Sequence, residues 1–252
     1  MIDLSEQHVF IAGGSRGIGA AAARMAARAG ADVTINYRAD SAAAKRVIED
    51  VQALGRKALA VQADISVEGA MDRAVDEAVA NLGHLTGMVV SASIFEPGFI
   101  QDMTAAFWDR VMGTNLKGTF LAVKAAARQM RLARKGGSIV IYTSTAGQRG
   151  SSEYSAYATS KGGQIMFMRS MAKELGADRI RVNCVAPAWT ETDMAAPSLD
   201  VLGRENVAKD FALGRIGLPE DAAGATVFLL SDLASFITGS TITVDGGMDM
   251  RG

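Results

Sequence analysis

Short apolar runs rich in β-branched residues alternate along the chain with longer segments whose apolar residues recur every three or four positions. The short runs predict buried strands, and the longer segments predict amphipathic helices. The predicted strands are His8–Ala12, Val33–Tyr37, Lys57–Gln62, Gly87–Ala92, Ser138–Tyr142, Ile180–Val185 and Thr241–Val244. The predicted helical stretches are Gly17–Ala29, Ser41–Leu54, Val67–Leu82, Thr104–Arg134, Ser155–Gly176 and segments within Glu191–Leu230.

Strands and helices that alternate at this spacing favour right-handed crossovers and a parallel sheet with helices on both faces. No linker, low-complexity tract or repeat interrupts the pattern. We therefore expect residues 1–252 to form one α/β domain around a doubly wound parallel sheet of seven strands. The longest irregular region, residues 188–213, carries Pro197 and scattered apolar residues, and it is predicted to be a mobile flap over a site.

The composition limits the class of protein. Of the 252 residues, 49% are hydrophobic and only 4 are proline, which is typical of a globular chain with a deep core. The net charge is −1 and no long basic run occurs, so no nucleic-acid partner is expected. No long apolar run is free of charges, and the first residues are acidic where a signal peptide is basic. We expect a cytoplasmic protein without a membrane partner.

Cysteine and histidine are scarce. Cys184 is the single cysteine, which excludes an intrachain disulfide and fits a reducing compartment. His8 begins a predicted strand and His84 follows a predicted helix, so both are interpreted as structural. No metal site is expected.

A glycine-rich turn follows the first predicted strand, with the sequence Gly13-Gly-Ser-Arg-Gly-Ile-Gly19. A side chain at position 13, 17 or 19 would obstruct the tight turn, the approach of a phosphate or the packing of helix on strand. The N-terminus of the next helix offers free N–H groups and the positive end of its dipole to a pyrophosphate. Between a strand and a helix, these glycines indicate a Rossmann-type nucleotide site.

The end of the second predicted strand bears on the choice of cofactor. A carboxylate there would bind the ribose hydroxyls of NAD, but this chain has Asn36-Tyr37-Arg38 instead. Arg16 in the glycine turn can also reach the adenosine, and Asp40 lies beyond the strand end. Two guanidinium groups favour a 2′-phosphate, so we expect NADP(H) rather than NAD(H).

Four polar residues predict the chemistry. Tyr157 and Lys161 are four apart and share one helix face, where the Lys161 ammonium is expected to lower the pKa of Tyr157 from about 10. Ser144 follows the fifth predicted strand, at the edge where parallel sheets bind ligands, and could hydrogen-bond a substrate oxygen. Asn115 lies in a helical stretch and could hold a water in a proton relay behind Lys161.

These pieces together resemble the short, single-domain branch of the short-chain dehydrogenases/reductases, over essentially the whole chain and with similarity to 3-oxoacyl-acyl-carrier-protein reductases. The matching motifs are the glycine turn, Asp64-Ile65, Asn115, Ser144, Tyr157/Lys161, Val182-Asn-Cys-Val-Ala-Pro187, Arg215-Ile-Gly-Leu-Pro-Glu-Asp221 and Val244-Asp-Gly-Gly247.

The resemblance implies a role for each matching residue. Ser144 would orient the carbonyl, Tyr157 would be the acid/base, Lys161 would bind the nicotinamide ribose and Asn115 would support the relay. Asp64 would bind the adenine amine, and residues 187–192 would hold the nicotinamide carboxamide. The implied cofactor-binding residues are Gly13, Ser15, Arg16, Gly17, Ile18, Gly19, Tyr37, Arg38, Asp64, Ile65, Ser91, Ala92, Tyr157, Lys161, Pro187, Ala188, Thr190 and Thr192.

The chain departs from the family pattern at four positions. Ala12 stands where the family usually has Thr, and Val90 where it has Asn, which we interpret as a paired apolar substitution. Ser93 and Ala188 each replace a usual glycine near the nicotinamide end. None of these departures touches the four catalytic positions.

The leading hypothesis is therefore an NADP(H)-dependent oxidoreductase that interconverts a ketone or aldehyde and an alcohol, its substrate a modest apolar compound. The pocket is expected to contain Ser93, Phe95, Gln148, Tyr154, Trp189 and Met194. A 3-oxoacyl-acyl-carrier-protein reductase is an alternative, although Gln129 and Asp178 stand where relatives dock the carrier with arginines. A non-catalytic NADP(H)-binding regulatory protein is an alternative of another class.

A homotetramer is also predicted, because relatives assemble through two surfaces. One surface is formed by the helices around residues 104–134 and 155–176, and the other by the last helix and strand. The residues expected to favour these contacts are Ala156, Ala158, Gly162, Gly163, Phe167, Met168, Met171, Phe236–Gly239 and Ile242–Val244.

Overall fold

Seven strands of the computed structural model, which describes residues 2–250, form one parallel sheet in the order β3-β2-β1-β4-β5-β6-β7. All seven predicted strands are present, with ends that shift by one or two residues. They are β1 (His8–Ala12), β2 (Asp32–Tyr37), β3 (Ala58–Gln62), β4 (Gly87–Val90), β5 (Gly137–Tyr142), β6 (Ile180–Pro187) and β7 (Thr241–Val244).

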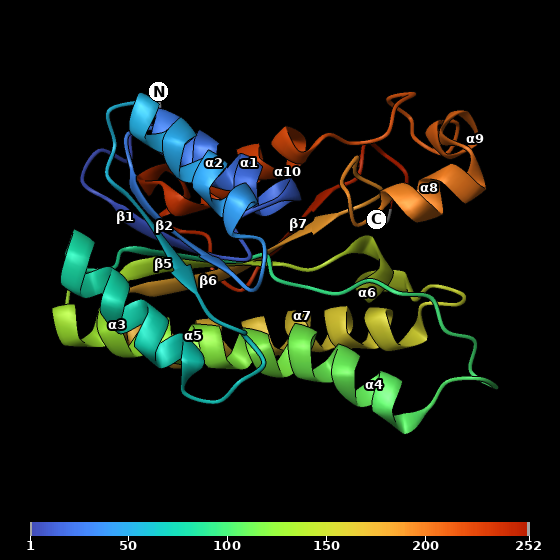
Figure 1. Cartoon of the computed structure of the whole chain (residues 1–252), viewed down its shortest axis with the longest axis horizontal. Coiled ribbons are helices and arrows are strands. Elements are labelled where there is room, and N and C mark those ends of the chain that lie inside the picture. Colours follow the sequence, from blue (N-terminus) through green and yellow to red (C-terminus); the bar gives the residue numbers. More distant parts are fainter. Residues whose placement is uncertain (1, 251–252) are drawn as a thin grey trace.

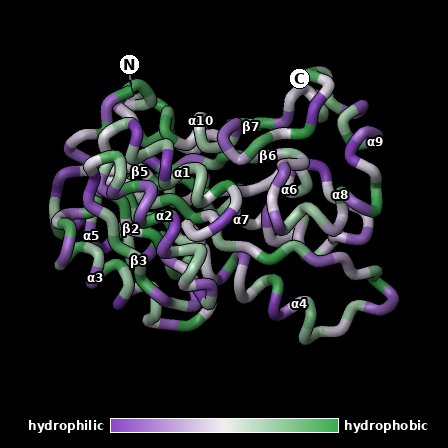
Figure 2. Tube along the Cα trace, turned by 45° about the horizontal axis from the view of Figure 1, so that its top comes forward, coloured by the Kyte–Doolittle hydropathy of each residue, from purple (hydrophilic) through white to green (hydrophobic). Residues whose placement is uncertain are grey.

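Helices cover both faces of the sheet (Figure 1). One layer contains α1 (Gly17–Arg28), α2 (Ser41–Ala53) and α10 (Pro219–Leu230), and the other contains α3 (Ala70–Leu82), α5 (Gly118–Ala133) and α7 (Ser155–Leu175). Each layer buries an apolar cluster against the strands, which explains why the strands are apolar on both sides. Hydrophobic stretches run along the central strands, and hydrophilic stretches recur along the outer helices (Figure 2).

The segment predicted as one helix from Thr104 to Arg134 is interrupted. It consists of α4 (Ala105–Met112), a π-helical turn (Gly113–Lys117) and α5. Hydrophobic periodicity runs through such a turn, so the sequence pattern did not reveal it. The turn carries Asn115 and buries its side chain completely.

The region predicted as a flap contains two short helices, within the stretch where helical segments are expected. Residues 188–213 contain α8 (Ala196–Leu202) and α9 (Arg204–Ala208), at the end of the molecule where β6 and β7 finish (Figure 1). The two helices share a small apolar core of their own, made by Ala195, Leu199, Val207, Phe211 and Ile216.

Several residues predicted to lie between subunits instead pack inside the chain. Met168 and Ala156 are buried, and a Cβ at Gly163 would lie 3.0 Å from the Leu116 side chain. The small residues of α7 therefore allow the π turn to approach this helix closely. Phe167 and Met171 are partly buried against the apolar cluster between the sheet and the layer of α3, α5 and α7.

The direction of the chain reverses in the middle of the sheet. From β1 the chain runs outward to β2 and β3, and it then crosses back to β4 on the other side of β1. At such a switch point, the loops after neighbouring strands diverge and leave a crevice at their carboxyl ends. A cavity of about 520 Å³ opens there. Within residues 2–250, no helix is both long and apolar enough to cross a membrane.

Candidate active site

Two glycines of the turn after β1, Gly13 and Gly19, have no room for a side chain. Gly13 has a left-handed φ of 78°, and a Cβ there would lie 2.5 Å from the backbone nitrogen of Ala92. A Cβ at Gly19 would collide with the carbonyl oxygen of Gly13. The backbone can therefore approach β4 closely, and the N-terminus of α1 faces the cavity at Gly17 and Ile18. Such a turn fits the pyrophosphate of a dinucleotide.

Two arginines stand at the end of the cavity beside the glycine turn and the tip of β2. Arg16 and Arg38 are exposed, and both line it. Asp40 is turned away from the tip of β2, because its carboxylate caps α2 by accepting a hydrogen bond from the Ala43 N–H at 2.8 Å. Asp64 lies across the cavity, and hydrogen bonds from Ser66 lower the pKa of its carboxyl group.

The four departures from the family pattern fit into this framework. Ala12 and Val90 are direct neighbours in the pairing of β1 with β4, and both are buried. This confirms that the two positions form one apolar contact. Ser93 and Ala188 both line the cavity, and neither has a left-handed φ, so their side chains are accepted without backbone strain.

The predicted catalytic residues come from two elements beside the cavity. Tyr157 and Lys161 lie one turn apart near the N-terminus of α7. Ser144 follows β5 and caps the short helix α6 (Thr145–Arg149), with its hydroxyl accepting from the Ala146 N–H at 3.1 Å. All three of the predicted residues line the same cavity.

Burial, rather than the neighbouring ammonium, dominates the titration of this pair. Desolvation raises the pKa of Tyr157 to about 12, and the hydrogen bond with Ser144 opposes this rise only in part. The expected lowering of the Tyr157 pKa is therefore wrong. Lys161 instead donates to the Tyr142 carbonyl at 2.8 Å, and desolvation lowers the pKa of its amine to about 7. At neutral pH, Tyr157 holds its proton and can serve as an acid.

Asn115 lies behind these residues in the π turn and does not line the cavity. Its Oδ1 accepts from the Ile94 N–H at 2.8 Å, and its Nδ2 donates to the Ile94 carbonyl at 3.0 Å and to Ser160 Oγ at 3.1 Å. Ser160 in turn donates to the Tyr157 carbonyl at 2.7 Å. The amide therefore connects the loop after β4 with the catalytic helix.

Aromatic side chains gather beside Tyr157 in the cavity. Phe95 stacks on Tyr154 with ring centroids 4.2 Å apart. It also forms edge-to-face contacts with Tyr157 and Trp189, whose ring centroids lie 4.8 Å and 5.8 Å from its own. Of the predicted pocket residues, Ser93, Phe95, Trp189 and Met194 line the cavity, and Tyr154 lies behind Phe95. Gln148 does not line it, because its amide donates to Thr243 at 3.2 Å.

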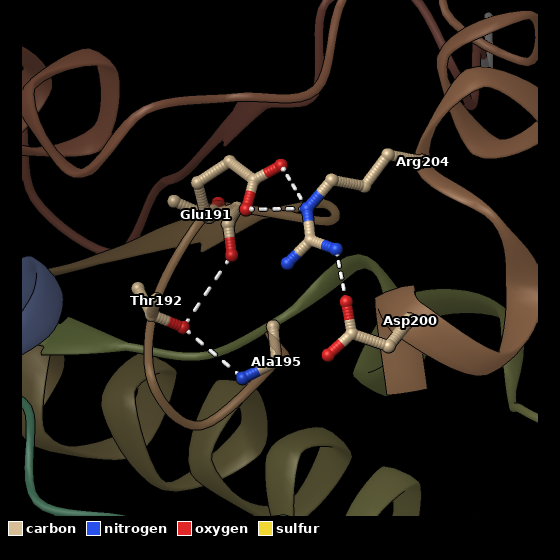
Figure 3. Close-up of polar contacts among 6 residues, drawn as sticks. Glu191, Thr192, Ala195, Asp200 and Arg204 are labelled. Carbon is tan, nitrogen blue, oxygen red and sulfur yellow. Dashed lines mark hydrogen bonds and ion pairs between the residues drawn. The ribbon is translucent and has the colours of Figure 1, made fainter. Parts of the chain in front are cut away.

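Polar contacts within residues 191–204 hold the flap beside the cavity. Thr192 accepts a hydrogen bond from the Ala195 N–H at 3.3 Å, and its methyl group faces Gly17 of the glycine turn. The preceding residue, Glu191, forms an ion pair with Arg204 of α9 at 3.1 Å, and Arg204 also contacts Asp200 (Figure 3). Farther along, Tyr154 and Ser198 of α8 share a hydrogen bond of 2.9 Å.

Most of the residues predicted for cofactor binding line this one cavity, and Gly19 lies beneath it with no room for a side chain. Sequence reasoning missed several lining residues, most of them on the segments that follow β3, β4, β5 and β6 in the chain. These residues are Asn36, Ala63, Ile94, Glu96, Thr114, Tyr142, Thr143, Thr145, Ala146, Arg149, Ser151, Asp193 and Ala195.

Comparison with known proteins agrees with this architecture. A family model described as enoyl-(acyl carrier protein) reductase matches residues 12–249. The chain is 36% identical over 251 residues to a 3-oxoacyl-[acyl-carrier-protein] reductase of Synechocystis sp., covering 99% of this chain and 100% of the relative. It is 38% identical over 246 residues to an L-rhamnose 1-dehydrogenase (NAD(P)(+)) of Sphingomonas sp., covering 97% of each.

A crystal structure of a short-chain type dehydrogenase/reductase from Mycobacterium marinum superposes with a TM-score of 0.94 at 33% sequence identity, covering 99% of this chain and 98% of that one. The architecture is therefore shared along the whole chain. The named substrates of the relatives differ, so the likeness extends to the oxidoreductase chemistry and not to one substrate.

Proposed function

Because the chain belongs to the short-chain dehydrogenase/reductase family, we propose that it is an NADP(H)-dependent oxidoreductase that reduces a ketone or aldehyde to an alcohol, or catalyses the reverse reaction. One observation carries this proposal: a single cavity joins the glycine turn to Ser144, Tyr157 and Lys161. When bound, the nicotinamide supplies or accepts the hydride. The protein's own contribution is to bind, orient and protonate.

Each of the four polar residues has a proposed role. The Ser144 hydroxyl orients the substrate carbonyl, and Tyr157, protonated at neutral pH, gives its proton to the oxygen as negative charge develops there. Lys161 binds the nicotinamide ribose and helps return a proton to the tyrosine. Asn115 supports this relay by fixing Ser160 and the loop at Ile94.

A preference for NADP(H) over NAD(H) is supported by charge at the adenosine end. Arg16 and Arg38 are available to a 2′-phosphate, because neither guanidinium is held in an ion pair within residues 2–250. Of the two acids nearby, Asp40 is engaged as a helix cap, and Asp64 accepts hydrogen bonds from Ser66. The proposed cofactor residues are those that the family resemblance implies.

The aromatic side chains around Phe95 favour a modest apolar or flat carbonyl compound, since rings pack against such surfaces with little loss of entropy. A carrier-protein substrate is less well supported. The two positions compared with carrier-docking arginines hold Gln129, bonded to Asp76, and Asp178, paired with Arg131. The acidic side chain at position 178 would repel an acidic carrier.

We also propose that the flap moves to admit substrate, and that the protein is a cytoplasmic homotetramer. Assembly is supported by apolar side chains left exposed on the two predicted surfaces. Phe120 and Met166 lie on α5 and α7, while Leu233 and the fully exposed Phe236 lie between α10 and β7.

Replacing Tyr157 by phenylalanine tests the proposed function. Tyr157→Phe keeps the ring that contacts Phe95 but removes the acidic proton. With a panel of ketones and NADPH oxidation as the signal, kcat should fall by about 10²–10⁴-fold. NADPH binding, followed by fluorescence, should remain nearly unchanged. A variant that keeps more than about a tenth of the wild-type kcat would show that Tyr157 is not the acid.

A further inference from the structure

Gln164 lies on α7 two turns after Tyr157, and its side chain is only 1% exposed. Its Nε2 donates to the main-chain carbonyl of Asn115 at 2.8 Å and to Thr119 Oγ1 at 2.7 Å. Thr119 Oγ1 donates to the same Asn115 carbonyl at 2.6 Å. The amide thus bonds the turn that carries Asn115 to the catalytic helix.

These contacts fix the orientation of the Gln164 amide. Both hydrogens of Nε2 are used by acceptors, and a flipped amide would bring Oε1 against the Asn115 carbonyl oxygen. In the orientation that results, Oε1 is buried and has no hydrogen-bond partner among the described residues. An unpaired buried acceptor is costly, so this one on the helix that carries Tyr157 calls for an explanation.

A suitable donor group lies one turn away on the same helix. Lys161 precedes Gln164 by three residues, a spacing that makes their side chains neighbours. Its amine has up to three N–H donors, and among residues 2–250 it has one hydrogen-bond partner, the Tyr142 carbonyl. The side-chain amide of Asn115, by contrast, already binds Ile94 and Ser160.

We propose that Gln164 is a positioning residue for proton transfer at Tyr157, a proposal that rests on the proposed function. Its amide nitrogen holds the Asn115 turn against α7, and its Oε1 accepts a hydrogen bond from a water that exchanges protons with Lys161. In reduction, Tyr157 gives its proton to the substrate oxygen, Lys161 returns a proton to Tyr157, and the water returns one to Lys161. No electrons move in these steps, and one proton enters from solvent.

Three variants separate this role from a purely structural one. Gln164→Leu removes donor and acceptor with little change in volume, and Gln164→Glu in its protonated form keeps one donor and the acceptor. Ser138→Ala is the matched control, because it removes a buried hydrogen bond to the Leu229 carbonyl at the opposite end of β5. For the wild type and each variant we would measure steady-state kinetics with NADPH and the fastest-reduced ketone. The solvent deuterium isotope effect on kcat and the melting temperature complete the comparison.

For Gln164→Leu we expect kcat to fall by about tenfold or more, as for other losses of proton-transfer assistance, with KM changed by less than about twofold. The solvent isotope effect on kcat should increase, because proton transfer becomes slower. Gln164→Glu should recover part of kcat, and Ser138→Ala should leave kcat unchanged.

Two results would overturn the proposal. One is a Gln164→Leu enzyme with wild-type kcat and isotope effect, whatever its melting temperature. The other is a loss that appears in KM alone or that Gln164→Glu does not relieve. If the wild-type protein neither reduces a carbonyl compound with NADPH nor oxidises an alcohol with NADP⁺, the proposed function fails as well. An active wild type with an equally active Gln164→Leu variant refutes only the role of Gln164.

Discussion

Lys161→Met should make the protein more stable at neutral pH while removing its activity. The amine is buried, and desolvation lowers its pKa to about 7. The other titratable groups beside it are Tyr157 and Cys184, whose pKa values burial raises to about 12. Both are uncharged over the working range and cannot balance an ammonium ion. The folded chain therefore bears the cost of a buried, poorly compensated amine.

The size of this cost follows from linkage. An unfolded lysine has a pKa of about 10.4, so between pH 7 and that value the unfolded chain binds more protons than the folded one, and stability rises with pH. At about 1.4 kcal/mol per pH unit, Lys161 lowers the free energy of unfolding by about 4 kcal/mol at pH 7 and by about 2 kcal/mol at pH 9.

Methionine fills a similar volume and carries no charge, but it cannot donate to the Tyr142 carbonyl. Losing that hydrogen bond costs about 2 kcal/mol, because a buried carbonyl loses a donor. Lys161→Met should therefore exceed the wild type by about 2 kcal/mol at pH 7 and match it near pH 9.

Urea unfolding of the apoprotein at pH 6, 7, 8 and 9 measures the difference, with Lys173→Met as the control because Lys173 is an exposed residue of the same helix. A difference for Lys161→Met that stays constant across this range would refute the reasoning, and so would one that grows with pH.

Two further predictions concern the cofactor and the assembly. Arg38→Asp should lower kcat/KM for NADPH by about tenfold or more and move the preference toward NADH. The reason is that a carboxylate would repel the 2′-phosphate and can bind ribose hydroxyls. A wild-type preference for NADH would contradict this prediction. Light scattering should give about four times the chain mass of 26.3 kDa, and Phe236→Ser should reduce it; a wild-type mass near that of one chain would refute the tetramer.

The sequence predicted most of the fold because strand and helix periods differ clearly in this chain. The parallel sheet needs strands buried on both faces, and runs such as Ser138–Tyr142 meet that requirement without reference to distant residues. The π turn at Gly113–Lys117 was missed because one extra residue in a helix leaves the apolar pattern nearly intact. The burial of Met168 could not be told from an interface, since both place an apolar side chain on one helix face.

The candidate site was predicted where motif and position agree, as for Ser144 and Tyr157, which line the same cavity. The pKa of Tyr157 was predicted in the wrong direction because the spacing to Lys161 is visible in the sequence and the loss of solvent is not. The sequence does contain a signal for Gln164. It is a polar residue seven positions after Tyr157, on the same inward face of the helix.

The attachment of the flap through Arg204 makes this part of the molecule sensitive to ionic strength. The ion pairs of Arg204 with Glu191 and Asp200 are reached by solvent. Such pairs contribute about 0–1 kcal/mol each and weaken as salt screens them. The packing of the Thr192 methyl group beside Gly17 and the edge-to-face packing of Trp189 with Phe95 involve no charge. Added salt therefore loosens the outer edge of the flap while leaving its inner contacts in place.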